Sequence, residues 1–132
     1  MRTHRILIAD DNAMNVTIAE TVLLAERFEV AVAVDGGEVL QKVASFRPDL
    51  ILMDIQMPGR DGLSLTRELK SDAATRHIRI VAFTAFAMRG DEARMRAAGC
   101  DGFLSKPIEV LKFGAQVRAC LERPADQFVA KQ

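Results

Sequence analysis

The chain has 132 residues, of which 49% are hydrophobic and 27% charged. These proportions are typical of one soluble globular domain, and no apolar run approaches the roughly 20 residues that a membrane-spanning helix needs. Lys and Arg number 18, as do Asp and Glu, so the formal net charge is zero. Because nucleic-acid-binding domains usually carry a basic surplus, we expect no direct nucleic-acid binding, no membrane insertion and a cytoplasmic location.

Short apolar runs alternate with segments of helical period along the whole chain. The apolar runs cover residues 6–9, 30–34, 50–53, 80–83 and 102–104, and the helical segments cover residues 18–26, 39–46, 65–69, 88–97 and 110–121. Runs that are apolar throughout indicate strands of a parallel sheet that is buried on both faces. Five strand–helix units predict an α/β fold, a (βα)5 doubly wound sheet. Gly99 is expected to cap the fourth helix, and Pro124 to end a domain of residues 1–124, with 125–132 as a C-terminal tail.

Polar residues follow four of the five predicted strands. Asp10 and Asp11 follow the first, Asp54 ends the third, Thr84 ends the fourth and Lys106 follows the fifth. In an open parallel sheet the carboxyl ends of the strands meet at one edge, where ligands bind. We therefore expect three carboxylates, one hydroxyl and one ammonium group to share a crevice.

Three carboxylates in one crevice repel one another unless a cation or protons intervene. Ligands that are all oxygen favour a hard cation, Mg²⁺ above all, with Mn²⁺ also compatible. Asp10 and Asp11 are the expected metal ligands beside Asp54. A carboxylate is a competent phosphoryl acceptor, and Lys106 would neutralise charge on the transferring group.

Each of these residues also has a simpler structural interpretation. An Asp or Asn after a strand is often only the N-cap of the next helix, which could explain Asp11 or Asn12, and we expect Asp61 to be a cap. Thr84 could be an ordinary strand-end hydroxyl, and Lys106-Pro107 a plain turn. The functional hypothesis depends on all of these residues meeting at one edge.

With these residues in place, the chain resembles the receiver domain of two-component response regulators over essentially its full length. The stretches that carry the resemblance are Asp10-Asp11, Leu52-Met53-Asp54-Ile55-Gln56-Met57-Pro58, Val81-Ala82-Phe83-Thr84-Ala85 and Ser105-Lys106-Pro107. Within the family, residues 84–92 and 105–108 resemble single-domain regulators of the DivK type.

The resemblance implies a CheY-like, flavodoxin-like fold of five parallel strands in the order 2-1-3-4-5. It also implies that Asp54 is the phosphoacceptor and that Asp10, Asp11, Asp54 and the backbone carbonyl of Gln56 hold the metal. Thr84 and Phe103 would be the switch residues and Lys106 the phosphate-binding lysine, with a cis Lys106–Pro107 bond. Phe103 lacks the hydroxyl that a tyrosine at this position would carry.

The resemblance further implies a phosphohistidine donor, which is a histidine kinase or a histidine phosphotransfer protein. With no room for an output domain, we expect the phosphorylated chain to act on a downstream protein through the surface of the fourth helix, fifth strand and fifth helix. We expect no enzymatic activity beyond the chain's own phosphotransfer and slow autodephosphorylation, because Phe86 would orient water poorly at Asp54. Arg89, Arg94 and Arg96 form either a solvated helix face or part of a surface for an acidic partner.

Three other functions are weighed against this one. A receiver domain cut from a hybrid histidine kinase would carry the same residues. A phosphorylation-independent module with this fold should have lost an acidic residue, Thr84 or Lys106, and none is lost. A haloacid-dehalogenase-like phosphatase needs its nucleophile in an Asp-x-Asp motif after the first strand, which here is followed by Asp10-Asp11.

Overall fold

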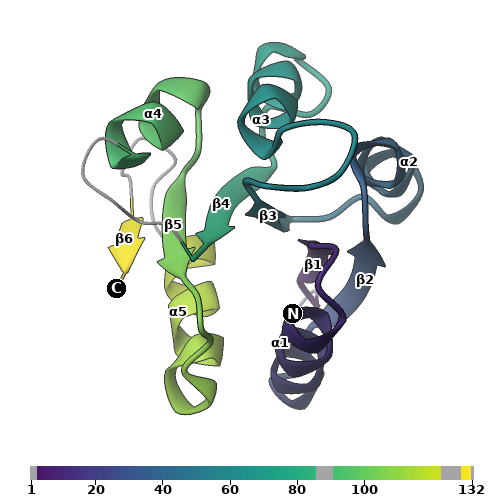
Figure 1. The fold of residues 1–132 in the computed structure, drawn as a ribbon. Coiled ribbons are helices and arrows are strands. Elements are labelled where there is room, and N and C mark those ends of the chain that lie inside the picture. Colours follow the sequence, from purple (N-terminus) through teal and green to yellow (C-terminus); the bar gives the residue numbers. More distant parts are fainter. Residues whose placement is uncertain (1–2, 86–90, 123–128, 132) are drawn as a thin grey trace.

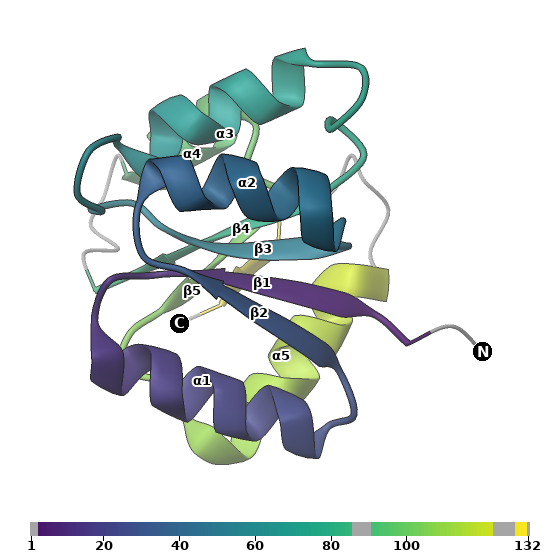
Figure 2. The same ribbon diagram turned by 90° about the vertical axis from the view of Figure 1, so that its right-hand side faces the viewer.

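The computed structural model of the chain describes residues 3–85, 91–122 and 129–131. It has one parallel sheet between two layers of helices (Figures 1 and 2). The strands are β1 (Arg5–Ala9), β2 (Glu29–Ala33), β3 (Leu50–Asp54), β4 (Arg79–Thr84), β5 (Gly102–Ser105) and β6 (Val129–Lys131). The helices are α1 (Ala13–Ala25), α2 (Gly36–Phe46), α3 (Gly62–Ser71), α4 (Asp91–Ala98) and α5 (Val110–Glu122).

The strands lie in the order β2-β1-β3-β4-β5-β6. The first five confirm the predicted alternation of strands and helices and the predicted order 2-1-3-4-5. In the centre of the sheet Ile8 pairs with Val32 on one side and with Leu52 on the other. The order reverses between β1 and β3, so the carboxyl ends of these two strands flank the point at which ligands bind in open α/β sheets.

The two faces of the sheet bury separate apolar clusters. Helices α2, α3 and α4 cover one face and α1 and α5 cover the other (Figure 2). Successive residues of a strand point to opposite faces, so Leu7 packs with the first helix layer and Ile6 and Ile8 pack with the second. This double burial explains why the strands read as continuous apolar runs. In the described part of the chain, no helix is long and apolar enough to cross a membrane.

Gly99 ends α4, as predicted. Its φ angle is +104°, a left-handed conformation that glycine adopts without a steric penalty. The amide of Gly99 donates to the carbonyl of Arg96, and the amide of Cys100 donates to that of Met95. This pair of hydrogen bonds is the Schellman pattern that closes many helices. Met88, which the helical period assigns to the same helix, lies outside the described residues.

The sheet has one strand more than the sequence predicts. Residues 129–131, in the expected C-terminal tail, form β6 and pair in parallel with β5. Three residues are too few for a hydrophobic period to show. The addition leaves the predicted arrangement of the other five strands unchanged.

Candidate functional site

Asp10 and Asp11 lie in the turn that leads from β1 into α1. Asp10 is fully buried, and its amide donates to the carbonyl of Ala33, which extends the pairing of β1 with β2 by one residue. Asp10 Oδ1 accepts a hydrogen bond of 2.9 Å from the amide of Asn12. Asn12 is the N-cap of α1 and accepts from the amide of Asn15. Asn12 is thus the capping residue of this turn, while the Asp11 side chain is exposed and free of that role.

Asp54 is the last residue of β3 and is 7% exposed. Its Oδ1 accepts a hydrogen bond of 3.1 Å from the amide of Gln56. One carboxylate oxygen from each of Asp10, Asp11 and Asp54 can be chosen so that all three lie within 4.8 Å of one another. The structure therefore brings together three acidic residues that come from the ends of two strands, β1 and β3.

Lys106 provides the positive charge of the crevice. Its ammonium group lies 2.8 Å from Asp10 Oδ2 and 3.5 Å from Asp54 Oδ2, and 4.9 Å from the centre of the Phe83 ring. The Lys106 amide donates to the Thr84 carbonyl at 2.8 Å, which ties the start of the β5–α5 loop to the end of β4. The Lys106–Pro107 bond is cis.

The crevice is short of positive charge and of hydrogen-bond donors. Asp10 Oδ2 is buried without a hydrogen bond from any of the described residues, so its contact with Lys106 is an ion pair only. Burial raises the pKa of Asp54, and the nearby Asp10 carboxylate raises it further; the Gln56 amide and Lys106 act in the opposite direction. One ammonium group faces three carboxylates, and a bound cation would relieve the imbalance.

Thr84 lines the crevice, and Phe103 lies on the adjacent strand β5. Thr84 ends β4 and is 3% exposed, and it pairs in register with Ser105 of β5. Phe103 is also 3% exposed and packs in the apolar cluster below α3 and α4. The resemblance implies that Phe103 is a switch residue, and in this structure its ring is already buried. Without a hydroxyl, the ring has no polar atom that favours an outward position.

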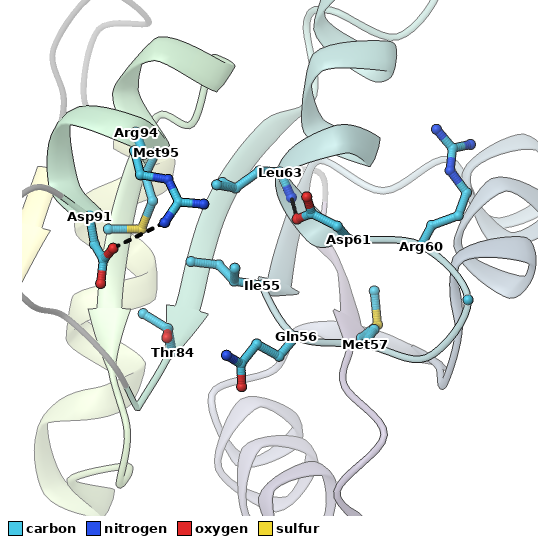
Figure 3. Close-up of a pocket in the computed structure, with 11 residues that line it drawn as sticks. Ile55, Gln56, Met57, Arg60, Asp61, Leu63, Thr84, Asp91, Arg94 and Met95 are labelled. Carbon is cyan, nitrogen blue, oxygen red and sulfur yellow. Dashed lines mark hydrogen bonds and ion pairs between the residues drawn. The ribbon is translucent and has the colours of Figure 1, made fainter.

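Two hollows meet at Thr84 and Gln56. The acidic crevice, of about 220 Å³, is lined by Asp10, Asp11, Asn12, Asn15, Asp54, Gln56, Thr84, Ala85 and Lys106. The second hollow, of about 370 Å³, lies between the β3–α3 loop and the start of α4 (Figure 3). Here the Asp61 carboxylate accepts from the Leu63 amide and caps α3, as predicted. Arg94 pairs with Asp91 at 3.4 Å, and Phe86 and Arg89 lie outside the described residues.

Sequence reasoning misses the role of Gly62. This first residue of α3 lies against the backbone that carries Asp54: a Cβ added to it would clash with the Asp54 carbonyl and stand 2.9 Å from Ile55 Cα. Its amide donates to the Ile55 carbonyl. The absence of a side chain lets α3 start directly behind the acceptor. The only signal in the sequence is a glycine after the capping residue Asp61.

The sequence profile of the family described as response regulator receiver domain matches residues 6–118. The chain belongs to this family. It is similar to the polar-differentiation response regulator DivK of Brucella anthropi, with 42% identity over 116 residues, which are 88% of this chain and 94% of that protein. The Brucella ovis DivK is 41% identical over 119 residues, 90% of this chain and 97% of the relative. The chain is thus a receiver domain homologous to the DivK response regulators of two-component signalling.

Solved structures of receivers have the same fold. A putative response regulator from Chloroflexus aurantiacus aligns with a TM-score of 0.86 and 30% identity, over 92% of this chain and all of that one. The receiver domain of the sensor histidine kinase PA1611 from Pseudomonas aeruginosa, which has a magnesium ion coordinated in its active-site cleft, aligns with a TM-score of 0.82 and 30% identity, with the same coverage. These two solved receivers support the fold described for this chain.

The close contact between Gly62 and the backbone of Asp54 predicts the effect of adding a methyl group at residue 62. Gly62→Ala should lower the free energy of unfolding by about 2 kcal/mol, because the new Cβ has to push α3 away from β3. Gly37→Ala, within α2, is the matched control; its added Cβ meets only the Asp35 carboxylate at 3.4 Å. That change should be neutral or stabilising by up to about 1 kcal/mol. Equal effects of the two substitutions in urea unfolding would contradict the contact.

The raised pKa of Asp54 predicts a stability that depends on pH. In metal-free buffer at pH 7, Asp54→Asn should raise the free energy of unfolding by about 1 kcal/mol, because it removes a buried negative charge. The folded chain holds the Asp54 proton more tightly than the unfolded chain does, so this residue destabilises the wild type increasingly as the pH rises from its ordinary pKa through the raised one. The advantage of the variant should shrink at about pH 4. Urea unfolding with EDTA at both pH values checks this, and a variant less stable than wild type at pH 7 would refute it.

Proposed function

We propose that the chain accepts a phosphoryl group on Asp54 from a phosphohistidine and signals by binding another protein. The observation that carries this proposal is the crevice itself, in which a nearly buried carboxylate stands beside two further carboxylates and one ammonium group. The phosphodonor would be a histidine kinase or a histidine phosphotransfer protein, the donors of the family to which the chain belongs.

Mg²⁺ is the cation that suits this crevice best. Its ligands would be Asp10, Asp11, Asp54 and the backbone carbonyl of Gln56, with waters or phosphoryl oxygens in the remaining positions. Asp10 Oδ2 supports this assignment: it is buried and has no hydrogen bond among the described residues. The Lys106 ammonium that faces it is also shared with Asp54, so a second cation would offset the remaining negative charge. Mn²⁺ fits the same oxygen ligands. When bound, the ion would stabilise negative charge on the phosphoryl oxygens during transfer.

The transfer forms one bond and breaks one. An oxygen of Asp54 bonds to phosphorus as the phosphorus–nitrogen bond of the phosphohistidine breaks, and the electron pair of that bond stays on the imidazole nitrogen. The Asp54 carboxylate is held for this by the Gln56 amide, which binds Oδ1 and leaves Oδ2 toward Lys106. The Lys106 ammonium would then pair with the phosphoryl oxygens.

Exposed apolar side chains at the starts of α1 and α5 support a protein as the phosphodonor. Met14 in the first turn of α1 is 72% exposed, and Val110 and Leu111 at the start of α5 are 56% and 99% exposed. Both helices begin at the edge of the sheet that carries Asp54, so these apolar side chains flank the crevice. Apolar side chains gathered beside a site favour a protein contact over open solvent.

Phosphorylation would act through Thr84 on the face formed by α4, β5 and α5, and a partner protein would bind this face. Thr84 lines the crevice, and its hydroxyl would donate to a phosphoryl oxygen. A movement of Thr84 would also move the start of the β5–α5 loop, because the Thr84 carbonyl accepts a hydrogen bond from the Lys106 amide. Such a local change of charge can bias a two-state surface. The Phe103 ring is already buried and would keep its packing.

The test is the intact mass of the purified chain after incubation with acetyl phosphate. The wild type should gain the mass of one phosphoryl group with Mg²⁺ and none with EDTA, and Asp54→Ala should gain none. Asp61→Ala is the matched control: Asp61 is an acid at the same edge of the sheet, but its carboxylate caps α3, so this variant should be phosphorylated like the wild type. Failure of the wild type with several small phosphodonors would instead favour a phosphorylation-independent interaction module.

A further inference from the structure

The outer edge of β5 is covered by the chain's own C-terminal strand. Gly102, Phe103 and Leu104 pair in parallel with Val129, Ala130 and Lys131 (Figure 1, where β6 is yellow). The family profile matches residues 6–118, so β6 lies beyond the part of the chain that defines the receiver fold. β6 is therefore an addition to that fold in this chain.

The position of β6 matters because of what β5 carries. β5 holds Phe103 in its centre and ends immediately before Lys106, and its other edge pairs with β4 up to the Thr84–Ser105 pair. Without β6, the outer N–H and C=O groups of β5 would form an open edge between α4 and α5. An open edge is a template on which another extended chain can add a strand.

The pairing is also easy to reverse. β6 has three residues, which is shorter than an average strand, and it lies at the edge of the sheet. An extended segment from a partner could pair with the same three residues of β5, Gly102, Phe103 and Leu104. β6 would hold its place because it is tethered, which raises its local concentration.

We propose that the outer edge of β5 is a strand-addition site that β6 occupies from within the same chain. The partner that fits this site is a protein that presents an extended segment parallel to β5, and it has to displace β6 to bind. Only the statement that a signalling partner uses this edge rests on the proposed function. The occupancy of the edge by β6 does not depend on Asp54 or on phosphorylation.

The first experiment opens the edge with proline in the full chain. Alternate residues of an edge strand direct their N–H groups toward the neighbouring strand, so Val129→Pro with Ala130→Pro removes at least one donor whichever way β6 is turned. Amide exchange by NMR should become at least tenfold faster within 102–104. The control, Val129→Thr with Ala130→Ser, keeps the backbone donors and should exchange like wild type, and unchanged exchange at Ile8 and Leu52 would show that the sheet is intact.

The second experiment fills the opened edge from outside. A synthetic peptide with the sequence of residues 125–132 should move the amide signals of Gly102, Phe103 and Leu104 in the proline variant back toward their wild-type positions. It should bind the wild type at least tenfold more weakly, because the tethered β6 competes, and a scrambled peptide should bind neither.

Three results would overturn the proposal. Equal amide exchange in the proline variant and the wild type would show that β6 does not protect β5. Equal binding of the peptide to both proteins, or to neither, would show that the edge is not a strand-addition site held by β6. Protection of 102–104 in the wild type that disappears on dilution, together with a dimer in sedimentation, would show that the strand comes from a second copy. None of these measurements uses a phosphodonor, so they succeed or fail separately from phosphorylation at Asp54.

Discussion

The ion pair between Lys106 and Asp10 is the contact on which the arrangement of the site depends. It joins the loop after β5 to the end of β1 at 2.8 Å, across the two strands β3 and β4 that lie between them in the sheet. Asp54 ends one of these two strands and stands 3.5 Å from the same ammonium group. A single cation thus holds two buried carboxylates that would otherwise repel each other, and it leaves a deficit of positive charge that a metal ion can make good.

The packing of the fold holds these carboxylates and Lys106 in place. Both faces of the sheet are buried, so the strand ends move little relative to one another, and Gly62 lets α3 start against the backbone of Asp54. The carboxylates are held where their charges are unfavourable. Under the proposed function, the stability that this costs would favour binding of a cation and a phosphoryl group. Proteins commonly give up stability at a functional site in this way.

Sequence reasoning predicts the strands, their order and the meeting of Asp10, Asp54, Thr84 and Lys106, because the carboxyl ends of parallel strands share one edge. It cannot predict that Lys106 lies closer to Asp10 than to Asp54, which depends on side-chain packing. It misses the close approach of Gly62 to Asp54, because this contact arises only when α3 packs against β3. It also misses β6, because three residues carry no period, and the inward position of Phe103, which depends on the space below α3 and α4.

The central claim is that Asp54 and a divalent ion together hold a phosphoryl group in this crevice, and beryllofluoride, a phosphoryl mimic, tests it most directly. With Mg²⁺ present, ¹⁹F NMR of the wild type should show signals of protein-bound fluoride from one beryllofluoride group, that is three fluorides, per chain. These signals should be absent with EDTA and absent in Asp54→Asn, whose amide cannot replace the carboxylate as a ligand of beryllium. Bound signals of equal intensity in Asp54→Asn, or in the wild type without a divalent ion, would contradict the claim.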